Sequence, residues 1–245
     1  MPTRTSRFLL NADVGEGIST DPQLIPWLDL ANISCGLHAG DVSSISQAVE
    51  LCTKNQTLIA AHPSLNDREG WGRRMLPLSP EDLAPLLDPQ IEFLMRYTAQ
   101  YDQKITFIKP HGALYHLLSH SLELTHVFAE WLQKSSLALT PILLAGSPGF
   151  QFLQKNGFSP LPEFFADRAY LPNGHLVPRS NPHAILTDPE ISQTQIRSLI
   201  QSLPTTPATF SGSHTTSQAT FCLHGDHPAA TSLAPILRTL LDDFS

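Results

Sequence analysis

Short apolar runs recur along the 245-residue chain, and each is followed at once by a polar segment that contains glycine or proline. The runs are continuous rather than alternating, which is typical of parallel strands buried on both faces. Sequence with helical spacing separates them. The pattern predicts seven strands, over residues 8–11, 31–34, 57–61, 105–109, 142–145, 163–165 and 219–223.

Capping residues and apolar positions three and four apart mark the helices between these strands. Asp21 is the predicted cap of a helix over 22–30, with Pro22 at its first position. Ser79 is the predicted cap of a helix that could reach residue 101, with an interruption at Pro89. The other predicted helices cover 42–52, 122–133, 148–155, a segment from 189 onward, and 228–241.

Strands that alternate with helices predict an α/β fold with a mostly parallel sheet. Seven strands are one short of the regular eight, so we expect an irregular (β/α) barrel. An open doubly wound sheet is the alternative. No linker rich in proline, glycine or serine divides the chain, which predicts a single domain over 1–245.

Composition and charge limit the kinds of binding partner that the chain could have. The net charge is -7 and no basic run occurs, which argues against nucleic-acid binding and favours a small molecule. No apolar stretch approaches membrane-spanning or signal-peptide length, so we expect a cytoplasmic protein with no membrane contact. Cys35, Cys52 and Cys222 are odd in number and widely spaced, as expected of reduced thiols.

Six polar motifs follow the predicted strands, and the carboxyl ends of parallel strands in a barrel meet at one rim. The first three motifs contain Asp13, His38 and His62, a carboxylate and two imidazoles that could bind a catalytic divalent metal. The alternative is that Asp13 caps a turn and both histidines hydrogen-bond to substrate or backbone. Glu16 and Asp41 are further acid/base candidates.

Two more histidines, His111 and His224, follow the fourth and seventh strands, and each precedes a glycine that permits close approach of a ligand. An imidazole titrates near neutral pH, so either could act as a general acid or base. The alternative for each is a structural role. Cys35 near His38 could be a thiol nucleophile, but a small buried cysteine is the favoured interpretation.

Positive side chains are concentrated in these motifs although the chain as a whole is acidic. Such a group suits a carboxylate or phosphoryl group, since arginine offers a planar fork to two oxygens. The alternative is a set of internal ion pairs with Asp67, Glu69 and Asp167. The predicted substrate-binding residues are Arg73, Arg74, Lys109, Arg168, Arg179 and Asp226.

The six motifs, in order and over nearly the whole chain, resemble the LamB/YcsF family. The strings are LLNADVGEG, ANISCGLHAGD, AAHPSLNDREGWGRRML, IKPHGALYH, EFFADRAYLPNGHLVPRS and CLHGDHPAA. The resemblance implies a seven-stranded barrel of the glycoside hydrolase/deacetylase type. It also implies the A subunit of an ATP-dependent 5-oxoprolinase, which opens 5-oxoproline to L-glutamate with two partner subunits, B and C, while ATP is hydrolysed to ADP and phosphate.

The related deacetylases hold a metal with an Asp-His-His set, and by motif position the resemblance transfers that role to Asp13, His38 and His62. Gly15-Glu16-Gly17 lacks the Gly-Lys-Ser/Thr ending of a phosphate-binding loop, so we expect ATP to be handled with the partner subunits. Two departures stand out: the loop between Gly17 and Pro22 is shorter than is usual in the family, and 204–218 is a Ser/Thr-rich stretch expected to form a surface loop.

Two other functions remain open from sequence. One is a stand-alone metal-dependent deacetylase or amide hydrolase that needs neither ATP nor partners. The other is a non-catalytic subunit that binds the substrate and delivers it to the active site of a partner.

Overall fold

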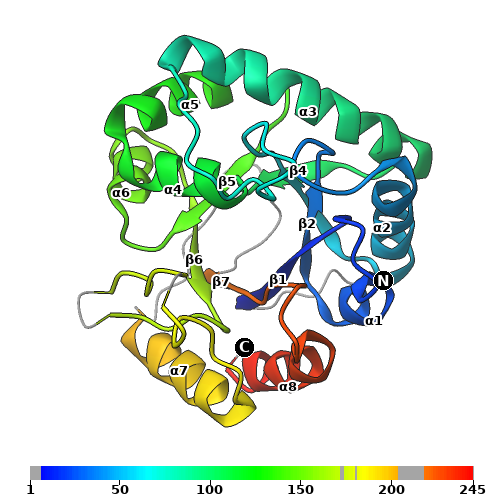
Figure 1. Cartoon of the computed structure of the whole chain (residues 1–245), viewed down its shortest axis with the longest axis vertical. Coiled ribbons are helices and arrows are strands. Elements are labelled where there is room, and N and C mark those ends of the chain that lie inside the picture. Colours follow the sequence, from blue (N-terminus) through cyan, green and yellow to red (C-terminus); the bar gives the residue numbers. More distant parts are fainter. Residues whose placement is uncertain (1–6, 172–173, 180, 204–217, 245) are drawn as a thin grey trace.

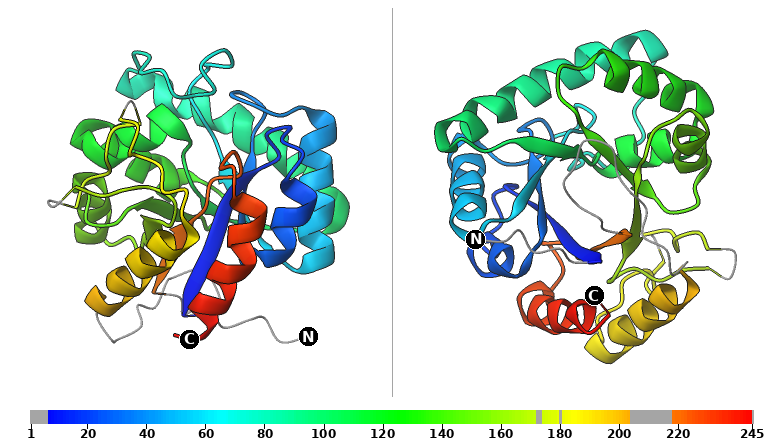
Figure 2. Two further views of the ribbon diagram at one scale, coloured as in Figure 1. Left: turned by 60° about the horizontal axis from the view of Figure 1, so that its bottom comes forward. Right: turned by 180° about the vertical axis from the view of Figure 1, so that it is seen from behind.

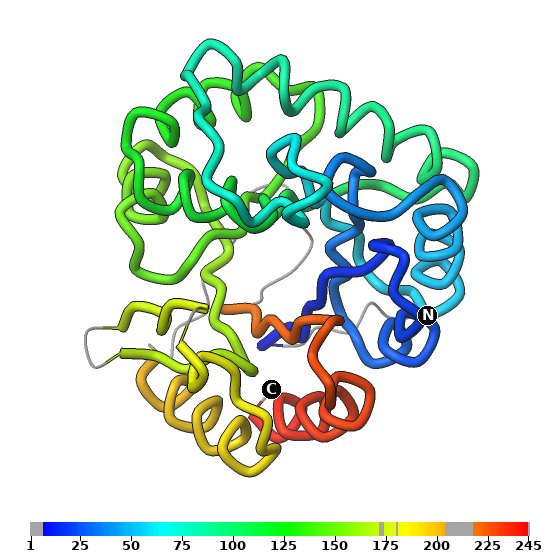
Figure 3. The backbone as a smooth tube through the Cα atoms, in the orientation of Figure 1, coloured from blue at the N-terminus to red at the C-terminus, as the bar shows by residue number. Residues whose placement is uncertain are grey.

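Seven parallel strands form a closed barrel in the computed structural model, which describes residues 7–171, 174–179, 181–203 and 218–244. The chain passes once round the barrel in sequence order, and β1 pairs with β7 to close it (Figure 3). The strands are β1 Phe8–Val14, β2 Leu30–Ser34, β3 Leu58–His62, β4 Ile105–Ile108, β5 Thr140–Leu144, β6 Leu161–Phe165 and β7 Ala219–Cys222. The predicted irregular seven-stranded barrel is confirmed, and closure excludes the open sheet.

Helices surround the strands on the outside (Figure 1), as two further views also show (Figure 2). They bury apolar side chains such as Phe128 and Leu237 against the barrel wall. The helices are α1 Asp21–Leu24, α2 Val42–Asn55, α3 Leu83–Thr98, α4 Gly112–His120, α5 Leu122–Lys134, α6 Pro148–Lys155, α7 Pro189–Ser202 and α8 Ala230–Asp242. Short 3-10 turns cover Ile25–Trp27, Pro80–Asp82 and Ala99–Tyr101.

The helix predicted over 22–30 is wrong in length and in its cap. Only α1 and a 3-10 turn form there, because Pro26 has no N–H to continue an α-helix and Leu30 already begins β2. Asp21 lies inside α1, and its carboxylate accepts the N–H of Gly15 at 2.7 Å instead of capping. Its role is therefore to hold the loop that follows β1.

Two other helix predictions differ from the structure. Pro89 does not interrupt α3, because apolar side chains on both sides of it, including Leu87 and Ile91, are buried against the barrel. Ser79 caps no backbone N–H, since its hydroxyl donates to the Asp82 carboxylate. Helix α4 was not predicted.

Side chains on each strand alternate between the interior of the barrel and its outer wall. A separate apolar cluster takes one residue from each of six strands: Leu9, Leu30, Ala60, Phe107, Ile142 and Leu161. Two residues after five of these apolar residues, on the same strand or just past its end, stand Asn11, Asn32, His62, Lys109 and Glu163, all buried. The polar groups therefore form the next layer above the apolar one, toward the carboxyl ends of the strands.

No helix in the described part of the chain has the length and apolarity needed to cross a membrane. The cytoplasmic location stays a prediction. Most of the Ser/Thr-rich stretch expected as a surface loop, residues 204–217, lies outside the described residues.

Candidate functional site

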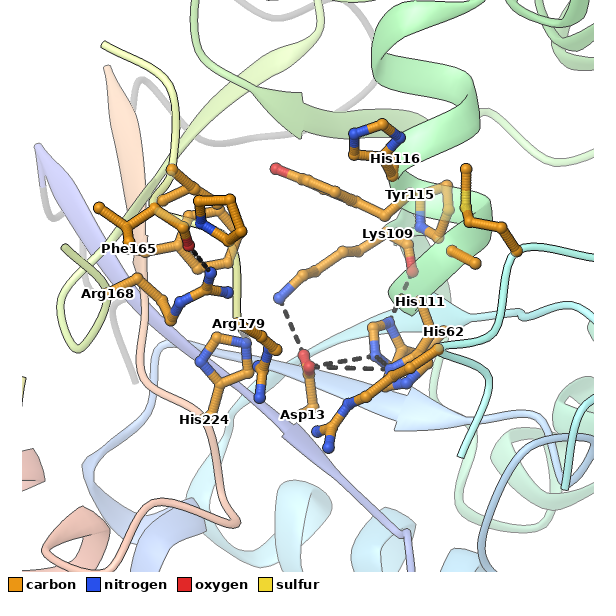
Figure 4. Close-up of a pocket in the computed structure, with 18 residues that line it drawn as sticks. Asp13, His62, Lys109, His111, Tyr115, His116, Phe165, Arg168, Arg179 and His224 are labelled. Atoms are coloured by element: carbon orange, nitrogen blue, oxygen red, sulfur yellow. Dashed lines mark hydrogen bonds and ion pairs between the residues drawn. The ribbon is translucent and has the colours of Figure 1, made fainter. Parts of the chain in front are cut away.

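A cavity of about 420 Å³ opens above the polar layer, at the carboxyl ends of the strands (Figure 4). The loop between β3 and α3 rises above this end of the barrel in the left view of Figure 2. The lining side chains come from strand ends far apart in sequence, as the motif pattern predicts. Among them are Asp13, His62, Arg73, Lys109, His111, Arg168, Arg179 and His224.

Lys109 forms a buried ion cluster at the base of this cavity. Its Nζ lies 2.8 Å from Asp13 Oδ1 and 3.0 Å from Glu163 Oε1. Burial alone would lower the pKa of Lys109, but the adjacent carboxylates outweigh it and raise the pKa well above its ordinary value. For Asp13, burial alone would raise the pKa, but His62 and Lys109 together lower it well below its usual range. Both groups are therefore charged at neutral pH.

The tautomers of His62 and His111 follow from their backbone contacts. His62 Nδ1 donates to the carbonyl of Lys109 at 2.6 Å, and His111 Nε2 donates to the carbonyl of Trp71 at 2.9 Å. Burial, with the neighbouring histidines, lowers the pKa of His111 well below its ordinary value, so this ring is neutral. In the neutral form the remaining nitrogens, His62 Nε2 and His111 Nδ1, both carry lone pairs, and they face each other at 2.8 Å.

His38 and Glu16 complete the cluster. His38 Nε2 lies 3.0 Å from Glu16 Oε1, and the His38 ring stacks on His111 with 4.0 Å between ring centroids. Burial lowers the pKa of His38, although Glu16 partly opposes this effect. Gly72, with φ of 67°, packs against the His111 ring and the Cβ of His38, and an added Cβ would lie 2.8 Å from His111 Cδ2. A residue with a side chain at this position would displace the imidazoles.

The donor set fits a metal ion. One donor atom from each of Glu16, His38, His62 and His111 lies within 4.8 Å of every other. Three imidazoles and a carboxylate form a set that suits a divalent transition metal. The predicted set of Asp13, His38 and His62 stays a prediction: Asp13 Oδ2 lies 3.3 Å from His62 Nε2, but Asp13 Oδ1 is already bound by Lys109.

His224 lies across the cavity from this cluster and forms a dyad with Asp167 (Figure 4 shows the imidazole). His224 Nδ1 lies 2.9 Å from Asp167 Oδ1, and Asp167 Oδ2 accepts the backbone N–H of His224 at 2.8 Å. Burial alone would raise the pKa of Asp167, but His224 lowers it below its ordinary value. An ionised Asp167 holds the proton of His224 on Nδ1, which leaves Nε2 without a partner among the described residues.

The predicted anion-binding residues are only partly brought together. Arg73, Arg168 and Arg179 line the cavity, and Asp226 pairs with Arg73 at 2.7 Å. Arg74 does not line the cavity, because its guanidinium pairs with Asp67 and Glu69. For Arg74, the alternative of an internal ion pair is therefore the one that the structure shows.

The guanidinium of Arg168 donates to the carbonyls of Ala184 and Val177, so it also holds the loop after β6. Burial, with the nearby charge of Arg179, lowers the pKa of Arg168 to about 10. Asp41 is exposed and caps α2 by accepting the N–H of Ser44 at 2.8 Å, so it takes no part in the site. Burial raises the pKa of Cys35 to about 12, which removes it as a thiolate nucleophile.

Sequence reasoning missed Asn11, Asn32 and Glu163. Asn32 donates to Asp13 Oδ1 at 2.9 Å and to Asn11 Oδ1 at 2.7 Å, while Asn11 donates to Glu163 Oε1 at 3.1 Å. The signal was present: each stands two residues after an apolar residue of the same strand. The dyad partner of His224 could not be recognised in this way, because Asp167 lies 57 residues away in sequence.

Fold and site together define a (β/α)-barrel protein with a polar pocket at the carboxyl ends of its strands. Comparison with known proteins narrows this class. The family model described as LamB/YcsF matches residues 9–245, and the chain belongs to the LamB/YcsF family.

Named relatives agree with this assignment. The chain is 36% identical over 239 residues to the A subunit of 5-oxoprolinase from Limosilactobacillus fermentum, a match that covers 95% of this chain and 94% of that protein. It is 32% identical over 241 residues to the A subunit of 5-oxoprolinase from Vibrio cholerae serotype O1, with 96% and 97% covered. The crystal structure of the lactam utilization protein from Thermus thermophilus superposes with a TM-score of 0.81 at 30% identity, covering 97% of each chain.

Proposed function

We propose that this chain is the A subunit, and the lactam-opening one, of an ATP-dependent 5-oxoprolinase, which converts 5-oxoproline to L-glutamate while ATP is hydrolysed to ADP and phosphate. Two partner subunits, B and C, would complete the enzyme and handle ATP. The observation that carries the proposal is the pocket, in which the His224–Asp167 dyad faces a buried cluster of carboxylates, imidazoles and Lys109. Relatives named as the A subunit of 5-oxoprolinase support the choice of substrate.

The carboxylate of 5-oxoproline finds its counter-charge on the arginine side of the pocket. Arg73 and Arg179 line the cavity, and Arg73 forms an ion pair with Asp226, its one ion-pair partner among the described residues. A guanidinium can bind the substrate carboxylate through two parallel hydrogen bonds. Lys109 is not free for this role, since Asp13 and Glu163 already hold its ammonium group. Its charge instead offsets part of theirs, which weakens the repulsion between the base of the pocket and an anionic ligand.

The ring opens when water adds its oxygen to the carbonyl carbon, the ring C–N bond breaks and the nitrogen gains a proton. His224 Nε2 accepts the proton of the attacking water and then donates it to the leaving nitrogen. Asp167 is a positioning residue, which keeps Nδ1 protonated and stabilises the imidazolium while it exists. Phosphorylation of the amide oxygen by ATP, which releases ADP, would make the same carbon more electrophilic. Addition of water and cleavage of the ring C–N bond would then give the acyl phosphate of glutamate, and a second water would hydrolyse it to glutamate and phosphate.

A divalent metal ion bound below the pocket would supply Lewis-acid chemistry to the carbonyl or to water. Glu16, His38, His62 and His111 are the residues of this chain that could hold it.

The test is reconstitution with the B and C subunits and measurement of ATP-dependent glutamate formation from 5-oxoproline. His224→Gln is expected to lower kcat by about 10²–10⁴-fold, the usual contribution of a general acid or base. Asp167→Asn is expected to lower kcat with KM unchanged, because it disturbs the tautomer of His224 and leaves the arginines in place.

The matched control is His126→Gln, since His126 is exposed on α5 and pairs with Glu130 at 3.3 Å. This variant should match the wild type. Full glutamate formation by His224→Gln would contradict the proposed role of the dyad. Turnover of simple amides by the chain alone, without ATP or partners, would favour the stand-alone hydrolase instead.

A further inference from the structure

The contact between His62 and His111 needs a positive charge to stabilise it, either a shared proton or a metal ion. Their facing nitrogens, Nε2 and Nδ1, are 2.8 Å apart, and the other nitrogen of each ring donates to a backbone carbonyl. Two lone pairs at this distance repel each other unless a positive charge lies beside them. Backbone carbonyls that fix imidazole tautomers in this way are the usual outer contacts of metal-binding histidines.

Negative charge is available at the same point. Glu16 Oε1 lies 3.6 Å from His111 Nδ1 and 3.0 Å from His38 Nε2. No lysine or arginine pairs with Glu16 in the described ranges, whereas the carboxylate of Asp13 is paired with Lys109. A buried carboxylate paired only with imidazoles calls for a cation.

The spacing agrees with coordination. Donor atoms bound to one tetrahedral zinc ion at about 2.0–2.1 Å stand about 3.3 Å apart. The separations among the four side chains include 2.8, 3.0 and 3.6 Å and none exceeds 4.8 Å, so the four donors already surround a space that one ion could occupy after side-chain rotation.

We propose that Glu16, His38, His62 and His111 bind one divalent transition-metal ion, with zinc the best match, and that Asp13 is not a primary ligand. Glu16 and His111 thus enter the expected ligand set and Asp13 leaves it. The ammonium group of Lys109, 2.8 Å from Asp13 Oδ1, weakens this carboxylate as a ligand for a second cation. The site does not depend on which amide the pocket accepts, so this proposal and the proposed reaction fail separately.

The first test measures metal directly in the full chain, purified without a polyhistidine tag. Elemental analysis is expected to find about one zinc or similar ion per chain. Protein from which metal has been removed with a chelator should take up one Zn²⁺ per chain in calorimetric titration. A second group of side chains, Asp13, Cys222 and His224, could also hold a metal ion, and it contains a thiol. Co²⁺ bound at the proposed site should therefore give a visible spectrum without a thiolate charge-transfer band.

The second test compares isosteric variants that separate the two ligand sets. Glu16→Gln and His111→Gln are expected to weaken Zn²⁺ binding by at least about 100-fold, beyond the 10–100-fold that loss of an outer contact costs. Asp13→Asn should remain within that outer-contact range, and His224→Gln should bind as the wild type does. Circular dichroism checks that each variant is folded, and the Co²⁺ spectrum of the wild type stands even if a variant does not fold.

A wild-type chain that takes up none of Zn²⁺, Mn²⁺, Fe²⁺ or Co²⁺ would overturn the proposal and leave a shared proton between His62 and His111 as the stabilising charge. Loss of binding in Asp13→Asn as large as that in Glu16→Gln would overturn the ligand set. A thiolate band in the Co²⁺ spectrum would place the ion with Cys222 instead.

Discussion

Replacing Lys109 by methionine should destabilise the barrel strongly. The Lys109 side chain is 2% exposed, and its ammonium group lies 2.8 Å from Asp13 Oδ1 and 3.0 Å from Glu163 Oε1. Methionine keeps most of the volume, so the loss is chiefly electrostatic. Each carboxylate loses a charge-assisted contact worth about 1.5–3 kcal/mol. We expect the free energy of unfolding to fall by about 3–5 kcal/mol, as for other buried pairs that lose one partner.

The loss in the free energy of unfolding of Lys109→Met should depend on pH. In the wild type Asp13 has a lowered pKa, so its charged form stabilises the fold above the pKa of the unfolded chain. Without Lys109, one of the charges that lower the pKa of Asp13 is gone, so its pKa in the folded state rises and its charged form stabilises the fold less. The wild-type contribution is present above the pKa of the unfolded carboxyl group and is lost as the pH falls toward the lower pKa of the folded state. The difference between wild type and Lys109→Met should therefore be larger at pH 8 than at pH 3.

Urea unfolding followed by circular dichroism measures both the loss of stability and its pH dependence. In a separate thermal unfolding experiment, the midpoint temperature is expected to fall by about 6–20 °C for a chain of this size. Adding Glu163→Gln to Lys109→Met should recover part of the loss, because one uncompensated charge disappears. Unfolding of Lys109→Met within about 0.5 kcal/mol of the wild type at pH 8, a change typical of surface sites, would refute the reasoning.

Other substitutions test other parts of the structure. Burial raises the pKa of Asp21 to about 6, so the folded state keeps a proton that the unfolded chain loses near pH 4, and stability falls as pH rises across this window. Asp21→Asn should remove up to about 3 kcal/mol of this dependence in urea titrations, and an unchanged pH slope would contradict the shift. Gly72→Ala should unfold at lower urea than Gly17→Ala, because both have positive φ but only Gly72 packs against an imidazole; equal losses would argue against that contact. In the reconstituted enzyme, Arg73→Ala should raise KM for 5-oxoproline by about 10–100-fold, because a charged hydrogen bond to the substrate is lost. Arg74→Ala is the control and should leave KM nearly unchanged, since Arg74 pairs with Asp67 outside the cavity. Equal effects of the two substitutions would remove Arg73 from the substrate site.

Much of the candidate site was predictable from the order of apolar and polar residues. The seven strands stand where the apolar runs predict them, and parallel strands bring their carboxyl ends to one rim. Asp13, His62, Lys109 and His111 therefore meet as expected. Helix α4 was missed because its sequence, beginning at Gly112, has no capping side chain at its start.

What the amino-acid sequence determined by itself was the fold class, the family and the identity of the polar residues, because local periodicity and motif order encode them. Only the tertiary structure decided which polar groups touch. It separates Arg74 from the pocket although Arg73 lines it, and it pairs His224 with Asp167. It also turns the bare nitrogen of His111 toward His62 through a carbonyl contact with Trp71. Such contacts depend on the direction of each side chain after the barrel closes, and sequence spacing does not contain that direction.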